Sequence, residues 1–148
     1  MVRLISSFFY IGYLPRMSGT YASITGLLIF FLLKGNPFYL QTLTGLIVFL
    51  GFLTCGRAEK VLNEKDSRKI VIDEVSGMLI CCCFIPATFF HALAAFFLFR
   101  VFDILKPFPI KRLEGIKGSL GVMLDDILAA FYALAALNII DYIRSILI

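Results

Sequence analysis

Long apolar runs, separated by short polar and basic stretches, occupy most of the 148-residue chain. A helix that crosses the hydrocarbon core of a bilayer, roughly 30 Å thick, needs about 20 largely apolar residues. The runs predict apolar helices at residues 21–33, 38–55, 75–85, 88–105 and 120–140. Pro86 separates the third run from the fourth, and Lys106-Pro107 ends the fourth. The pattern predicts an all-α, polytopic membrane protein of about five helices.

The first residues form a shorter apolar segment. Leu4, Phe8 and Ile11 recur at helical spacing, and Pro15-Arg16 ends the stretch. This spacing predicts a short helix that lies in the membrane interface. A secretory signal peptide is the alternative, but the apolar stretch is short and interrupted by polar residues. Because no repeat or linker divides the sequence, we expect residues 1–148 to form one domain.

Composition and charge support a membrane protein. The chain is 60% apolar and 16% charged, against about 45–50% and about 25% in soluble domains. The net charge is +4, but the basic residues gather in the connecting segments 56–69 and 106–118, whereas 34–37 and 86–87 hold only Lys34. This distribution sets topology and attracts anionic lipid rather than nucleic acid. We therefore expect the basic side to face the cytoplasm.

Carboxylates beside or within the apolar helices are the main chemical signal. Half of the ten acidic residues have this position: Asp73, Glu74, Asp103, Asp125 and Asp126. An ionised carboxylate in hydrocarbon is costly, so such residues are rare unless they are paired, bind a metal or line a polar cavity. If the helices alternate in direction, the start of the third, the end of the fourth and the start of the fifth share one membrane face. We expect the carboxylates to converge there.

Basic residues and a glycine turn belong to the same face. Arg100 precedes Asp103 by one helical turn, and Lys106 continues that side of the helix. Ser18-Gly19-Thr20 opens the first apolar helix, whose starting N–H groups suit phosphate oxygens. Mg²⁺ takes oxygen ligands and is often shared with substrate phosphate, whose charge Arg100 and Lys106 would neutralise. The pattern favours a divalent cation and a phosphate; structural ion pairs are the alternative.

Other reactive residues are expected to be structural. His91, the single histidine, precedes Asp103 by 12 residues, about 18 Å of helix, which places it near the opposite interface. Cys81-Cys82-Cys83 are expected to be reduced packing residues, because consecutive helical residues point about 100° apart. The sequence lacks a cysteine followed by arginine at the sixth position, an Asp-x-Asp pair and an Asp-Gly-x-x-Ala-Arg segment. These absences exclude the corresponding phosphatase and phosphotransferase classes and leave metal-dependent chemistry on carboxylates.

Several segments together resemble the phosphatidylglycerophosphatase A family. They are residues 19–23, 72–78, 99–110 and 121–129. The most specific is Arg-x-x-Asp-x-x-Lys-Pro-x-Pro-Ile at 100–110, with Asp125-Asp126 downstream. This chain departs from the family pattern at the first turn, where Ala22 replaces a glycine and Ser18 a usual proline.

The resemblance implies a Mg²⁺-dependent phosphatase of the bacterial inner membrane. It would convert phosphatidylglycerophosphate to phosphatidylglycerol and phosphate, with its active site facing the cytoplasm. It implies metal ligands at Glu74, Asp103, Asp125 and Asp126, with Asp73 as a further catalytic residue. The residues expected to bind phosphate are Ser18, Gly19, Thr20, Arg100 and Lys106. The alternatives are a phosphatase for another phospholipid headgroup and an ion-coupled transporter, which would distribute its carboxylates through the membrane depth.

Overall fold

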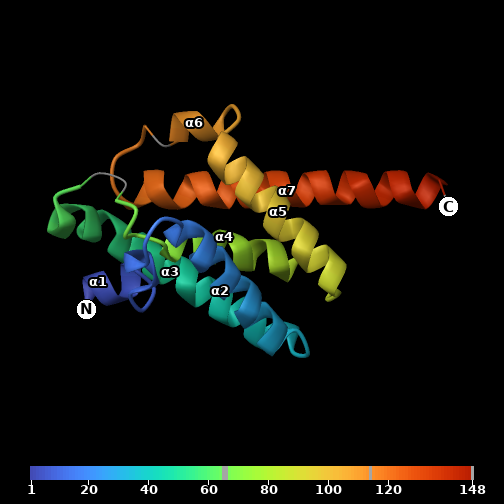
Figure 1. Ribbon diagram of the computed structural model, residues 1–148, viewed down its shortest axis with the longest axis horizontal. Coiled ribbons are helices and arrows are strands. Elements are labelled where there is room, and N and C mark those ends of the chain that lie inside the picture. The colour runs from blue at the N-terminus through green and yellow to red at the C-terminus, as the bar shows by residue number, and fades with distance from the viewer. Residues whose placement is uncertain (65–66, 114, 148) are drawn as a thin grey trace.

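The structure, a computed structural model, describes residues 1–64, 67–113 and 115–147; Lys65, part of the predicted basic segment 56–69, lies outside them. The described residues form helices and no strand (Figure 1), so the prediction of an all-α chain is confirmed. The elements in chain order are α1 Val2–Ser6, the 3₁₀ helix η1 Ile11–Tyr13, α2 Ser18–Leu33, α3 Pro37–Leu62, α4 Ile72–Cys83, α5 Phe89–Leu105, α6 Ile110–Leu113 and α7 Ser119–Leu147.

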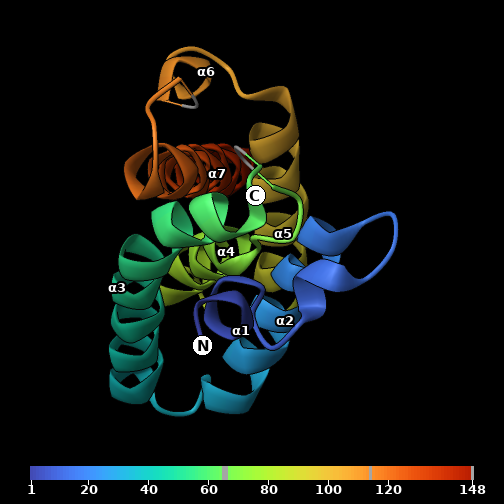
Figure 2. The ribbon, with the colours of Figure 1, turned by 90° about the vertical axis from the view of Figure 1, so that its left-hand side faces the viewer.

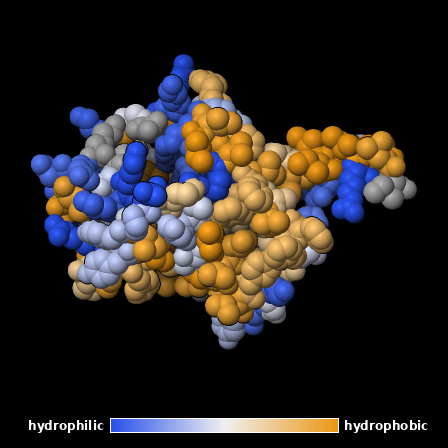
Figure 3. Space-filling model, viewed as in Figure 1, coloured by the Kyte–Doolittle hydropathy of each residue, from blue (hydrophilic) through white to orange (hydrophobic). Residues whose placement is uncertain are grey.

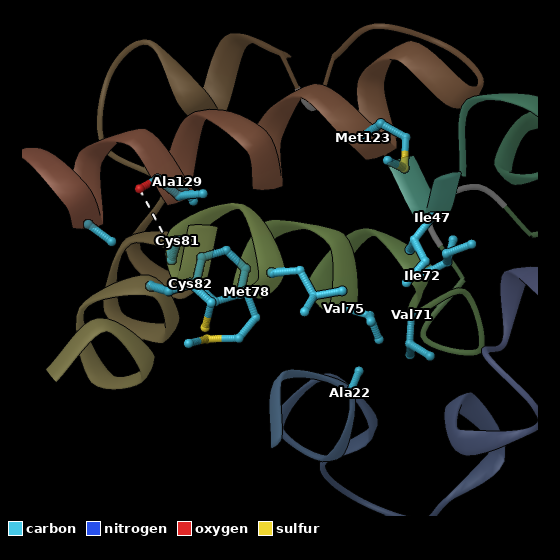
Figure 4. Packing of buried hydrophobic residues seen from close by; sticks show 14 of the residues in the cluster. Ala22, Ile47, Val71, Ile72, Val75, Met78, Cys81, Cys82, Met123 and Ala129 are labelled. Atoms are coloured by element: carbon cyan, nitrogen blue, oxygen red, sulfur yellow. Dashed lines mark hydrogen bonds between the residues drawn. The ribbon is translucent and has the colours of Figure 1, made fainter. Parts of the chain in front are cut away.

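Helix α4 lies at the centre of the bundle. It packs against α2, α3, α5 and α7, as the two ribbon views show (Figures 1 and 2). Val75 and Met78 belong to a buried cluster that takes in Ala22 of α2, Ile47 of α3 and Met123 of α7 (Figure 4). A helix enclosed on all sides must be apolar around its whole circumference, and α4 meets this condition except at its acidic first turn.

A glycine allows α4 to approach its neighbours closely. A Cβ atom on Gly77 would lie 2.7 Å from the ring of Phe99 on α5 and 3.2 Å from the carbonyl oxygen of Asp126 on α7. Small residues of this kind let helix backbones pack closely together. The contact brings Asp126 beside the acidic first turn of α4.

The predicted count of five membrane spans is not confirmed. All five apolar helices are present, but among the described residues only α3 and α7 have the length and hydropathy of a span. Helix α4 has 12 residues, about 18 Å of helix, which is shorter than a bilayer core. Helices α2 and α5 have 16 and 17 residues. In place of about five membrane-spanning helices, the described residues form two long apolar helices and three shorter ones.

Several predicted boundaries are wrong: two helices outlast their apolar runs, and the N-terminal helix is shorter than predicted. Helix α3 continues past Cys55 to Leu62 and ends at Asn63 in the left-handed conformation, φ 53°, so part of the predicted 56–69 connection is helical. Helix α7 likewise continues past Ile140 to Leu147. At the N-terminus, the helix stops at Ser6, and the backbone of Phe8, Phe9 and Tyr10 has positive φ.

Candidate active site

Four helix ends meet at one end of the bundle, where α2, α4 and α7 begin and α5 finishes (Figures 1 and 2). Hydrophilic side chains gather on this end, while hydrophobic ones cover most of the remaining visible surface (Figure 3). Two adjoining cavities open here, and both are lined by Arg68 and Glu74. We call them the acidic cavity and the arginine cavity.

The acidic cavity has a volume of about 240 Å³. Its lining contains all five carboxylates that the sequence singled out, together with two basic side chains. The full lining is Ser67, Arg68, Ile70, Asp73, Glu74, Asp103, Lys106, Asp125 and Asp126. The structure therefore brings together residues of α4, α5 and α7 that lie far apart in the sequence. The convergence expected from alternating helix directions is present.

Three of these carboxylates form a tight group, which we call the carboxylate cluster. Asp73, Glu74 and Asp126 each offer an oxygen atom, and these atoms lie within 4.8 Å of one another. Asp73 and Asp126 are 7% and 3% exposed, and Glu74 Oε2 is buried without a hydrogen-bond partner among the residues that the structure describes. Negative charges this close repel strongly away from water. The donor set fits a hard divalent cation, which prefers oxygen ligands and offsets that repulsion.

Two other carboxylates of the acidic cavity are held by basic side chains. Arg100 Nη1 donates to Asp103 Oδ2 at 2.6 Å, and Lys106 Nζ donates to Asp125 Oδ2 at 2.7 Å. Of the four predicted metal ligands, Glu74 and Asp126 thus join the cluster, whereas Asp103 and Asp125 lie in ion pairs beside it. The third member of the cluster is Asp73, which the sequence predicted as a catalytic residue but not as a metal ligand.

The arginine cavity, about 370 Å³, lies beside the start of α2. It is lined by Arg16, Met17, Ser18, Gly19, Thr20, Arg68, Glu74, Arg100 and Ile104. The predicted phosphate turn Ser18-Gly19-Thr20 is the first turn of α2 and lies here with Arg100. Lys106 lines the acidic cavity instead. The two basic residues predicted to bind phosphate therefore belong to different cavities.

Gly19 brings the start of α2 against both cavities. A Cβ atom at this position would lie 2.5 Å from Glu74 Oε1 and 3.1 Å from Arg100 Nη1. The neighbouring Ser18 hydroxyl donates to the carbonyl oxygen of Arg68 at 2.8 Å. This bond ties the helix start to the segment before α4. The absence of a side chain at Gly19 leaves the space that Glu74 and Arg100 occupy.

Arg16 and Arg68 were not predicted as site residues. Both are exposed and lie in connecting segments, where Arg16 has φ 72°. Their signal in the sequence was only a basic charge near Ser18 and near Asp73. A hydrophobic pattern gives helix positions but not the path of a connection, so it could not place these side chains.

The reactive residues outside the two cavities make structural contacts. His91 lies at the start of α5, with Nδ1 2.6 Å from Thr88 Oγ1 and Nε2 3.2 Å from Asp141 Oδ2. All four cysteines are free thiols, and Cys81 Sγ donates to the carbonyl oxygen of Ala130 at 3.5 Å. His91 therefore joins α5 to α7 at the other end of α5 from Asp103.

The fold and the cavities define an all-helical protein that presents a buried carboxylate cluster and guanidinium groups where its apolar helices end. The chain belongs to the phosphatidylglycerophosphatase A family, whose family model matches residues 4–141. It is thus a phosphatase, and the family suggested by its motifs is confirmed.

Bacterial relatives share most of the chain. A Haemophilus influenzae protein named phosphatidylglycerophosphatase A is 36% identical over 95% of this chain and 89% of its own length. The protein of that name from Escherichia coli is 30% identical, with coverage of 88% and 78%. A Bacteroides thetaiotaomicron protein named "Putative phosphatidylinositol-3-phosphatase" is 36% identical, with coverage of 88% and 87%. No solved structure matches the chain.

Proposed function

We propose that this protein is a Mg²⁺-dependent phosphatase that hydrolyses phosphatidylglycerophosphate to phosphatidylglycerol and inorganic phosphate. Its family and the names of two relatives support this substrate. The observation that carries the proposal is the carboxylate cluster, which lies in a cavity that also holds Lys106. Oxygen ligands beside a cationic side chain suit a metal ion that shares its coordination with a phosphate.

The cluster residues Asp73, Glu74 and Asp126 would hold the metal ion. When bound, a divalent cation stabilises charge that develops on the phosphoryl group and lowers the pKa of a coordinated water. Lys106 would hold a phosphate oxygen by an ammonium hydrogen bond. Asp125, 2.7 Å from Lys106 Nζ, would keep that ammonium group in position. Asp103 would do the same for the guanidinium of Arg100.

The first turn of α2 supplies a further phosphate contact in this proposal. N–H groups at the start of a helix have no acceptor within the helix and attract anions. Gly19 and Thr20 line the arginine cavity in this turn, and Ser18 fixes its position through Arg68. The catalytic set is therefore Asp73, Glu74, Arg100, Asp103, Lys106, Asp125 and Asp126, and Ser18, Gly19 and Thr20 form a turn that binds a phosphate group of the substrate.

We also propose a multi-pass position in the bacterial inner membrane, with the two cavities at the cytoplasmic face. Helices α3 and α7 support crossing by their length and hydropathy. The basic segments beside the cavities support the orientation and attract anionic lipid. Phe9 and Tyr10, 71% and 57% exposed, suit the membrane interface, where aromatic side chains gather. The grouping of carboxylates at one end argues against the transporter alternative.

The test is phosphate release by the purified protein from phosphatidylglycerophosphate in detergent micelles. We expect release with Mg²⁺, none with a chelator, and none from Asp126→Asn under either condition. Equal release with and without Mg²⁺ would contradict metal dependence.

The same assay on a lipid panel separates the headgroup alternatives. Phosphatidylinositol 3-phosphate belongs in the panel because of the name of the Bacteroides relative. A higher kcat/KM on that lipid would replace the proposed substrate while leaving the site unchanged.

A further inference from the structure

The two cavities carry opposite charge. The acidic cavity sets five carboxylates against Arg68 and Lys106. Among the described residues, the lining of the arginine cavity sets three guanidinium groups against one carboxylate, Glu74, and Asp103 outside this lining accepts from Arg100. A phosphodiester carries one negative charge and cannot ligate a metal as readily as a terminal phosphate. The carboxylates of the first cavity would repel it, and the guanidinium groups of the second would attract it.

The arginine cavity has unfilled hydrogen-bonding capacity. Arg100 Nη1 is engaged by Asp103, but the Nε–H of the same guanidinium is buried without an acceptor among the described residues. Guanidinium groups present donors in a planar fork that matches phosphate oxygens. Arg16 and Arg68 add two more such groups around the same volume. Among the described residues, Glu74 in the lining and Asp103 beside it offer fewer carboxylate acceptors than these three guanidinium groups offer N–H donors.

The rim of the arginine cavity is apolar. Met17 and Ile104 line it and are 59% and 69% exposed. Val101 and Leu105, close to Ile104 on α5, are also exposed. An exposed apolar surface beside a cationic pocket fits the acyl chains of a lipid whose phosphate enters the pocket. The acidic cavity has one apolar lining residue, the buried Ile70.

We propose that the arginine cavity binds the phosphodiester of the lipid substrate while its terminal phosphate lies in the acidic cavity. This inference rests on the proposed function, because phosphatidylglycerophosphate carries a diester on the lipid side and a monoester at the far end of its glycerol. Arg68 and Glu74 line both cavities and mark where that glycerol passes. Arg16 and Arg68 then determine specificity: they select lipids with a diester over phosphatidate, which has a terminal phosphate only.

The kinetic experiment uses the full chain in detergent with Mg²⁺ and compares phosphatidylglycerophosphate with phosphatidate of the same acyl chains. The variants are Arg16→Gln, Arg68→Gln and the double substitution. The matched control is Arg57→Gln, an exposed arginine that lines neither cavity. We expect the double variant to raise KM for phosphatidylglycerophosphate about tenfold or more, with little change in kcat. For phosphatidate, the kcat/KM of Arg16→Gln should equal that of the control, because Arg16 lines the arginine cavity and not the acidic cavity.

A binding experiment gives a readout independent of turnover. The probe is glycerophosphoglycerol, which holds the diester without acyl chains or a terminal phosphate. Calorimetry should show binding to the unsubstituted protein and to Arg57→Gln, and at least tenfold weaker binding to the double variant. Inorganic phosphate should bind the unsubstituted protein, Arg57→Gln and Arg16→Gln equally, because Arg16 lines the arginine cavity and not the acidic cavity.

These outcomes separate the two proposals. An unsubstituted protein that does not hydrolyse phosphatidylglycerophosphate overturns the proposed function, and the diester site then stands or falls on the glycerophosphoglycerol titration. An active protein whose double variant weakens on both lipids alike, or on neither, overturns the diester site. A melting temperature equal to that of Arg57→Gln shows that the variants are folded.

Discussion

Asp125 and Asp126 are adjacent in sequence, yet their surroundings differ. Asp126 belongs to the carboxylate cluster, whereas Asp125 accepts from Lys106 at 2.7 Å and from the backbone N–H of Asp126 at 3.0 Å. Consecutive helical residues diverge by about 100°, so one faces the cluster and the other faces the end of α5. Replacing each by asparagine should therefore have different consequences.

Asp126→Asn removes one of three repelling carboxylates, so in chelator the protein should be as stable as the unsubstituted one or more stable. It should lose the stabilisation by Mg²⁺, which for the unsubstituted protein is about 2.7 kcal/mol at a Mg²⁺ concentration one hundred times Kd.

Asp125→Asn removes a buried charge partner of Lys106 and should lower stability in chelator by about 2 kcal/mol. Thermal unfolding in detergent, with and without Mg²⁺, measures both. Identical behaviour of the two variants would contradict the assignment of Asp126 to the carboxylate cluster and of Asp125 to Lys106.

A substitution of Arg100 tests whether the site needs the paired donors of a planar guanidinium group. Its Nη1 donates to Asp103 at 2.6 Å, while its Nε–H is buried without an acceptor in the described part of the chain. Arg100→Lys keeps the charge but loses the paired donors. We expect kcat/KM to fall by about tenfold, equivalent to about 1.4 kcal/mol, with an unchanged melting temperature. Arg57→Lys, away from the cavities, is the control, and normal turnover by a folded Arg100→Lys protein would remove Arg100 from the site.

Gly19 tests the packing of the site without a charge change. In Gly19→Ala the atoms nearest to the new methyl group are the flexible ends of Glu74 and Arg100, so we expect these side chains to shift and the fold to be retained. Activity should fall by about tenfold or more at unchanged stability. Gly45→Ala is the matched control, because nothing lies within 4 Å of its Cβ position. That helical substitution should raise stability by about 0.5–1 kcal/mol and leave kcat unchanged.

The sequence predicted the chemical groups of the site better than their partners. Placing carboxylates at helix ends was enough to bring all five around one cavity, because helix direction alternates. The i, i+3 spacing already placed Arg100 beside Asp103, but the sequence could not tell that Lys106 meets Asp125, since that depends on how the chain runs from α5 to α7. Lys106 reaches Asp125 from a left-handed position, φ 42°. Arg68 was missed for the same reason, because it lies in the connection before α4.

At the scale of helices, hydropathy located the elements but not their ends. The apolar run of α3 stops at Cys55, yet Ala58 is still buried and the helix continues to Leu62. Residues of high helix propensity such as Ala, Glu, Lys and Leu extend a helix beyond its apolar face. Helix α4 shows the opposite case, because its 12 residues are shorter than a span and are stable through enclosure by four neighbours.

The enclosure of α4 makes Gly77 sensitive to added volume. A methyl group there would lie 2.7 Å from the ring of Phe99, which is fully buried and cannot move aside. Gly77→Ala should lower the free energy of unfolding by about 1–3 kcal/mol, despite the better helix propensity of alanine. Thermal unfolding measures this loss, with Gly45→Ala as the control. Adding Phe99→Leu should recover part of it, and additive effects of the two substitutions would contradict direct contact.

At the scale of the molecule, the two ends of the bundle differ in chemistry. The cavities lie where α2, α4 and α7 begin, while the connection after α2, residues 34–36, lies at the opposite end (Figure 1). The exposed Lys111 of α6 belongs to the basic connection between α5 and α7, on the cavity side. Alternating helix directions predicted this division, even though α3 and α7 alone among the described helices have the length and hydropathy of a span.

The orientation can be tested with single cysteines and a membrane-impermeant maleimide. Gly35→Cys places a thiol in an open connection with nothing within 4 Å, and Lys111→Cys places one on the cavity side. Three of the native cysteines are buried and Cys83 is half-buried, so the unsubstituted protein measures background labelling. The positive-inside rule predicts that intact spheroplasts label Gly35→Cys and that inverted vesicles label Lys111→Cys. The reverse pattern would place both cavities outside the cytoplasm, and labelling of both from one side would show that the bundle does not cross the membrane.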